Sequence, residues 1–121
     1  MDSSTVLRVA LFGLGRAGRI HLGNLIENDN FVIRYVVEMK GITNPHVPSD
    51  AEYIDATDDA AVEAVLADPE LDAVVVASPT HTHVSIAMRA LRANKHTFVE
   101  KPLAESVEDI KVGSNLVRTL T

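Results

Sequence analysis

Short apolar runs alternate along the chain with segments whose apolar residues repeat at helical spacing. The nearly unbroken, β-branched runs are typical of strands that are buried on both faces of a sheet. They predict strands over Val6–Phe12, Phe31–Val37, Glu52–Ile54, Ala73–Ala77 and Thr97–Glu100. The helical spacings predict helices over Arg16–Glu27, from Thr57 to Ala67, from Thr80 or Thr82 to about Ala93, and from Ser106 onward. Alternating strands and helices, joined by right-handed crossovers, predict an α/β fold with a parallel sheet and helices on both faces.

Each of the first three predicted helices carries an apolar stripe that we expect to face the sheet. The stripes are Gly18, Leu22, Leu25 and Ile26, then Val62, Val65 and Leu66, then Val84, Ala87, Met88 and Leu91. Thr57 is the expected N-cap of the second helix, and Asn94 is the expected left-handed stop after the third. Residues 39–51, MKGITNPHVPSDA, contain two prolines that oppose regular structure, so we expect an irregular crossover there.

The segment Val9–His21, VALFGLGRAGRIH, places three glycines between the first strand and the first helix. Gly13 permits a tight turn, Gly15 lets a pyrophosphate approach the backbone, and Gly18 lets the helix pack closely on the strand. The free N–H groups and the positive dipole end of the helix favour an anion there. We therefore predict that a dinucleotide binds at the loop residues Gly13, Leu14, Gly15, Arg16, Ala17 and Gly18.

An acidic residue about 20 positions beyond such a loop, at the end of the second strand, takes the ribose hydroxyls of the cofactor. Glu38 stands at that place. It favours NAD, because a carboxylate repels the 2′-phosphate of NADP, but it does not exclude NADP. The alternative is an ordinary strand, turn and helix whose glycines only shape the turn. The fold class that the pattern predicts is a Rossmann-type, doubly wound parallel sheet in a single domain.

The composition fits a soluble globular domain, with 46% hydrophobic and 23% charged residues. A formal charge of -6 and scattered basic residues argue against nucleic-acid binding. Cysteine is absent, which excludes disulfides and thiolate chemistry, and His81 and His83 alone make a poor metal site. The first residues, MDSSTVLRV, contain neither a signal sequence nor a membrane span, so we expect a cytoplasmic protein.

Four motifs in order resemble the nucleotide-binding half of the glucose-fructose oxidoreductase, inositol dehydrogenase and MocA (Gfo/Idh/MocA) family. They are GLGRAGRIH near the start, ASPTHTH after the fourth strand, NKH before the fifth and VEKPLA after it. The resemblance covers about Val6 to Lys111. It implies an NAD(P)-binding domain over residues 1–111, with a tail over 112–121 that is unlike the family. It also implies hydride transfer between a nicotinamide and a carbinol of a sugar, an inositol or a similar small molecule.

The resemblance assigns Lys101, within Glu-Lys-Pro, to a place beside the nicotinamide and the substrate hydroxyl. An amine there can polarise the hydroxyl and take its proton as the hydride leaves, and Glu100 could orient that amine. The alternative for Lys101 is a solvated lysine at a strand end. Further residues expected at the cofactor are Ser78, Pro79, Thr80, His83 and Glu100.

The histidines are expected mainly to pack. We expect His81 and His83 to pack at the cofactor loop or at the start of the third helix, with direct substrate contact as the alternative. His21 is expected to pack in the core or against a loop. His46 and His96 are expected in surface loops.

The family enzymes continue into a mostly antiparallel α/β domain that closes over the substrate, whereas this chain ends at Thr121. We therefore expect that C-terminal domain to be absent, as in a truncated isoform, a gene model read past an exon end or a natural short protein. Two function classes stay open: an oxidoreductase, and a dinucleotide-binding module with no turnover of its own. A second chain, or a homo-oligomer that closes the cleft, would favour the enzyme.

Overall fold

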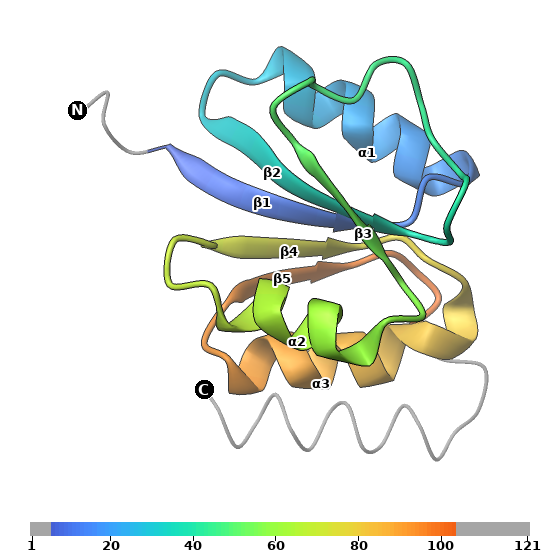
Figure 1. The fold of residues 1–121 in the computed structure, drawn as a ribbon, viewed down its shortest axis with the longest axis vertical. Coiled ribbons are helices and arrows are strands. Elements are labelled where there is room, and N and C mark those ends of the chain that lie inside the picture. Colours follow the sequence, from blue (N-terminus) through green and yellow to red (C-terminus); the bar gives the residue numbers. More distant parts are fainter. Residues whose placement is uncertain (1–5, 104–121) are drawn as a thin grey trace.

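A computed structural model describes residues 6–103 of the chain. Parallel strands form one sheet in the order β3-β2-β1-β4-β5 (Figure 1). The strands are β1 (Leu7–Phe12), β2 (Phe31–Glu38), β3 (Glu52–Asp55), β4 (Ala73–Val76) and β5 (His96–Val99). The helices are α1 (Arg16–Glu27), α2 (Asp59–Ala67) and α3 (His83–Arg92), with a 3₁₀ turn, η1 (Thr80–Thr82), before α3. The predicted Rossmann-type fold is confirmed; the predicted helix from Ser106 and the tail over 112–121 lie outside the described residues.

The sheet is buried between two layers, with α1 on one face and α2 and α3 on the other (Figure 1). Alternate residues of each strand supply the two cores, as the pleat of a strand requires. In β1, Val9 and Leu11 pack in the α1 layer, whereas Ala10 and Phe12 pack in the layer of α2 and α3. Within residues 6–103, no helix is long and apolar enough to cross a membrane.

The crossover from β2 to β3 is irregular, as its prolines predict. Val47 and Ala51 of this crossover pack against the core of the α1 layer. A doubly wound fold usually has a helix at this place. Here the apolar side chains of the crossover cover the sheet instead, so the core stays closed without that helix.

The buried faces of the first two helices are close to the predicted stripes. In α2 the three predicted residues are all buried. In α1, Gly18, Leu22 and Leu25 are buried, but Ile26 is 44% exposed. Ile26 follows Leu25 directly, so it points about 100° further round the helix and past the edge of the contact with the sheet.

The predicted stripe of α3 is confirmed at Ala87, which is buried, but the buried face as a whole is rotated from the predicted one. The residues that α3 buries are His83, Ala87 and Ala90, whereas Val84 and Met88 of the predicted stripe, like Leu91, are only partly buried. Alanine and histidine carry little hydrophobic signal, so the pattern of large apolar residues indicated the neighbouring face. The buried alanines let the helix approach the sheet closely.

Most predicted strand ends lie within one residue of the observed ones, and two differences concern a predicted cap and a predicted loop residue. The N-cap of α2 is Asp58, which accepts a hydrogen bond from the Ala61 N–H at 3.1 Å, whereas the Thr57 hydroxyl donates to the Asp55 carboxylate. The strand β5 begins at His96, which is exposed but is not in a loop. The predicted left-handed stop after α3 is confirmed, since Asn94 has a φ of 62°.

A β-bulge in β2 brings two neighbouring side chains to the same carboxylate. Val9 pairs with Ile33 and Ala10 with Tyr35, so Arg34 is the extra residue. The Tyr35 hydroxyl and the Arg34 Nε both donate to Asp68, at 2.6 and 2.7 Å. These bonds, led by that of Tyr35, hold the pKa of Asp68 well below its usual range.

Asp68→Asn should lower the free energy of unfolding at neutral pH by about 1–2 kcal/mol, because charge-assisted hydrogen bonds are lost. Since the folded pKa is depressed, the contribution of Asp68 is present above the unfolded pKa of about 3.9 and is lost as the pH falls through the folded pKa. Denaturant unfolding followed by circular dichroism should therefore show a difference from the wild type that shrinks below about pH 4. Asp50→Asn, at an exposed position, is the control. A difference that grows on acidification would contradict the assignment.

Candidate dinucleotide-binding site

The glycine loop follows β1, where the strand order of the sheet turns from β2 on one side to β4 on the other. Ligands bind at this switch point in doubly wound sheets. Gly13 has a φ of 103°, and a Cβ there would lie 2.6 Å from the carbonyl oxygen of Ala77. A Cβ on Gly18 would overlap the carbonyl oxygen of Gly13. The protein itself therefore requires glycine at both positions.

Gly15 is not required by the protein in this way. It precedes the first helical turn with a φ of -72°, which any residue can adopt, and a Cβ there would meet nothing within 4 Å. No side chain caps the helix at this end, and Arg16 and Ala17 begin its first turn. The first N–H groups of a helix lack partners within the helix. Open space above Gly15 and these N–H groups fit the pyrophosphate of a dinucleotide.

The carboxylate of Glu38 faces the glycine loop from the end of β2. One oxygen accepts from the Leu14 N–H and the other from the Met39 N–H, both at 2.7 Å. Leu14 itself is buried at 5% exposure, so its backbone, and not its side chain, takes part in the site. Each carboxylate oxygen has a second lone pair. The half-buried carboxylate can therefore accept from ribose hydroxyls while it holds the loop.

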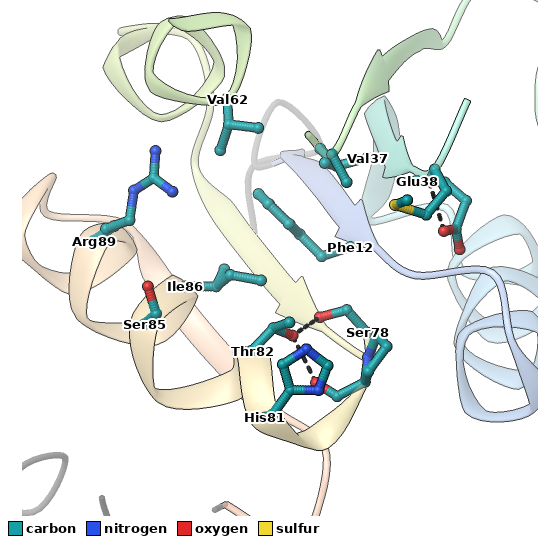
Figure 2. Close-up of a pocket in the computed structure, with 13 residues that line it drawn as sticks. Phe12, Val37, Glu38, Val62, Ser78, His81, Thr82, Ser85, Ile86 and Arg89 are labelled. Atoms are coloured by element: carbon teal, nitrogen blue, oxygen red, sulfur yellow. Dashed lines mark hydrogen bonds between the residues drawn. The ribbon is translucent and has the colours of Figure 1, made fainter. Parts of the chain in front are cut away.

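A cavity of about 600 Å³ lies beside Glu38, between the ends of β1 and β2, the helix α2 and the start of α3 (Figure 2). Phe12, Val37, Val62 and Ile86 make its walls largely apolar. Arg89 lies at the side of the cavity, where its guanidinium is 2.6 Å from the Glu63 carboxylate. An apolar cavity next to a carboxylate fits a flat, uncharged base attached to a ribose.

Ser78 and Pro79 line this cavity, as expected, whereas Thr80 lies in η1 and is not among the lining residues. The hydroxyl groups of Ser78 and Thr82 are hydrogen-bonded at 2.7 Å, which fixes the loop after β4 (Figure 2). Sequence reasoning missed several lining residues on helix and loop faces that no motif marks. They are Met39, Ala56, Thr82, Ser85, Ile86 and Arg89.

The two histidines near β4 have different surroundings. His81 is exposed and lines the cavity. His83 is only 2% exposed, and its ring nitrogens lie 2.7 Å from the Ser78 carbonyl oxygen and 2.9 Å from that of Pro102. His83 thus packs at the cofactor loop and at the start of α3, and it does not line the cavity. Among the described residues, no three potential ligand side chains gather as a metal site would need.

Lys101 follows β5 and is exposed. The preceding residue, Glu100, was expected to orient it, but the Glu100 carboxylate lies 3.1 Å from Nε2 of His21 in α1. His21 also packs edge-on against Phe98, with ring centroids 5.2 Å apart. Glu100 is therefore engaged with the first helix, and the packing predicted for His21 is present.

Comparison with known proteins agrees with this geometry. Residues 7–120 match the family model for GFO_IDH_MocA, described as an oxidoreductase family with an NAD-binding Rossmann fold. The chain belongs to this family. It is 31% identical over 104 residues to myo-inositol 2-dehydrogenase of Thermotoga maritima, a match that covers 86% of this chain and 30% of that protein. It is 34% identical over 114 residues to scyllo-inositol 2-dehydrogenase (NAD(+)) of Bacillus subtilis, over 93% of this chain and 32% of that protein.

The same fold is found in a solved structure. Apo scyllo-inositol dehydrogenase from Lactobacillus casei matches with a TM-score of 0.78 at 21% identity, over 98% of this chain and 35% of that one. The predicted family resemblance is thus confirmed. The chain is an NAD-binding Rossmann domain related to oxidoreductases such as the inositol dehydrogenases, and it spans about a third of the length of these relatives.

Proposed function

We propose that the chain binds NAD in one defined orientation and serves hydride transfer to or from a small carbinol. The observation that carries the proposal is the contrast among the glycines: Gly13 and Gly18 are required by the protein, but Gly15 faces open space. At the start of a helix, where free N–H groups attract an anion, a glycine that the protein itself does not require fits a pyrophosphate that approaches the backbone.

In the proposed orientation, the adenosine half of NAD lies between Glu38 and the apolar cavity. Glu38 accepts hydrogen bonds from the ribose hydroxyls, and the adenine packs between the apolar walls near Val62 and Ile86. The pyrophosphate lies over Gly15 at the start of α1. Ser78 and Pro79 then border the path of the cofactor from the end of β4 towards the end of β5.

At the other end of the site, Lys101 is proposed as the catalytic residue. The nicotinamide of the bound cofactor supplies the hydride acceptor or donor. The amine of Lys101 donates a hydrogen bond to the substrate oxygen and, in its neutral form, takes the hydroxyl proton. Because the matched relatives are named for inositols, we propose an inositol, a sugar or a similar polyol as the substrate class.

A dinucleotide-binding module without turnover of its own is the second candidate function. The exposure of Lys101 favours it, since proton transfer and hydride transfer both need a substrate that is held in line and shielded from water. The two candidates share the cofactor site and differ only in turnover.

Calorimetric titration should show that NAD binds at least about tenfold more tightly than NADP, a difference of about 1.4 kcal/mol. The physical reason is repulsion between the Glu38 carboxylate and the 2′-phosphate. Glu38→Gln should remove most of this preference, while Glu52→Gln, at an exposed position on β3, should preserve it. Equal affinities for the two cofactors in the wild type would refute the assignment of Glu38. A folded chain that binds neither at millimolar concentration would refute the proposed function.

A further inference from the structure

The two chain neighbours of Lys101 are each held by a histidine, and the two histidines come from opposite layers of the fold. His21, in α1, contacts the carboxylate of Glu100. His83, at the start of α3, contacts the carbonyl oxygen of Pro102. These two contacts bring α1 and the junction of η1 and α3 to the end of β5. They meet there on either side of the lysine that is proposed to contact the substrate.

The contact on the α1 side fixes Glu100 through its side chain as well as its backbone. The Glu100 N–H donates to the Val76 carbonyl oxygen at 2.8 Å, which continues the pairing of β4 and β5. The side chains of His21 and Glu100 are 22% and 28% exposed, so their contact at 3.1 Å is partly shielded from water. Phe98 packs edge-on against the imidazole of His21 and limits how that ring can turn.

The contact on the α3 side links the lysine segment to the cofactor loop. His83 is 2% exposed, and its second ring nitrogen lies 2.7 Å from the Ser78 carbonyl oxygen. Ser78 lines the cavity that is proposed to hold the adenosine half of NAD. One buried ring therefore joins the cofactor loop to the residue after Lys101.

We propose that His21 and His83 are positioning residues that fix the base of Lys101 between the glycine-loop helix and the cofactor loop. The inference rests on the proposed function, because it assumes that Lys101 meets the substrate. A lysine side chain has several rotatable bonds, so its backbone origin must be held if its amine is to find one place. The pairing of β5 in the sheet fixes the backbone on only one side of Lys101. The histidine contacts hold Glu100 and Pro102, the residues on either side of the lysine.

The test is carried out on the 121-residue chain after reductive ¹³C-methylation of its lysines, followed by NMR without cofactor. The Lys101 signal is assigned by its loss in Lys101→Arg. His21→Leu keeps the bulk of the ring but removes the contact with Glu100, and His21→Gln restores a donor. His83→Asn retains a donor at the buried site. The signals of Lys40 and Lys95 serve as internal controls.

We expect His21→Leu to shift and broaden the Lys101 signal while the control signals stay in place, and His21→Gln to restore at least half of the change. His83→Asn should move the Lys101 signal in a folded chain. A Lys101 signal that is identical in the wild type and in His21→Leu would overturn the inference, as would failure of His21→Gln to restore it. A separate measurement of NAD affinity distinguishes the two proposals. A wild-type chain that does not bind NAD refutes the proposed function, whereas an unchanged Lys101 signal refutes only the positioning role.

Discussion

Gly18→Ala is expected to destabilise the fold by about 2–3 kcal/mol, as other substitutions that overpack a core do, and to weaken NAD binding by at least about tenfold. The new Cβ would overlap the carbonyl oxygen of Gly13. That oxygen belongs to the backbone of the glycine loop and cannot move aside as a flexible side chain would. The loop or α1 must therefore shift, and the pyrophosphate site between them must shift as well. Denaturant unfolding and calorimetric titration measure the two effects.

Gly15→Ala is the matched control for Gly18→Ala, because it adds the same methyl group three residues earlier. Its Cβ would meet no protein atom within 4 Å, and its φ of -72° suits alanine. We expect its stability to stay equal or to rise by about 0.4–1 kcal/mol, while NAD binding weakens because the methyl group occupies the approach to the pyrophosphate. If Gly15→Ala bound NAD as tightly as the wild type, the proposed place of the pyrophosphate would be wrong. If Gly18→Ala were as stable as the wild type, the packing argument would fail.

The parts of the site that the sequence predicted are those that local chemistry dictates. A tight turn between a strand and a helix requires Gly13, which has a φ of 103°, and Gly18, which lies against a backbone carbonyl oxygen. The position of Glu38 could be predicted because one helix and one strand of ordinary length separate the glycine loop from the end of the neighbouring strand. The parallel sheet with helices on both faces follows from the alternation of strands and helices and the handedness of the crossovers. These rules need no knowledge of distant side chains.

The parts that the sequence did not predict depend on contacts between distant segments. The cavity needs α2 and α3 to lie at a set distance from the sheet, and Arg89 at its side is paired with Glu63 in α2, 26 residues away in the chain. The face of α3 was misplaced because His83, which carries little hydrophobic signal, is buried with its ring nitrogens against the carbonyl oxygens of Ser78 and Pro102, the latter 19 residues further along the chain. Glu100 was assigned to Lys101, its neighbour in sequence, although its partner in the fold is His21, 79 residues away.

Lys101→Ala should lower kcat by about 10²–10⁴-fold in a fusion protein in which the C-terminal domain of an inositol dehydrogenase follows Lys111. The physical reason is that the lysine amine is the group proposed to take the hydroxyl proton. Lys101→Arg keeps the positive charge but cannot release a proton near neutral pH, so we expect it to be nearly as inactive. Both variants should bind NAD within about threefold of the unsubstituted chain, a difference below 1 kcal/mol. Steady-state assays with an inositol and aldose panel, together with calorimetry, measure the two quantities.

The 121-residue chain by itself should bind NAD but turn over polyols more slowly than the fusion protein by several orders of magnitude. Positioning of reactants supplies several kcal/mol of barrier lowering, and each 1.4 kcal/mol is about tenfold in rate. Lys101 is exposed on this domain, so its amine is open to water. Arg92→Ala, at an exposed position of α3, is the control for the loss of one positive charge. Ordinary turnover by the bare chain that survives Lys101→Ala would refute the catalytic role of the lysine, because the reaction would then proceed without the amine that follows β5.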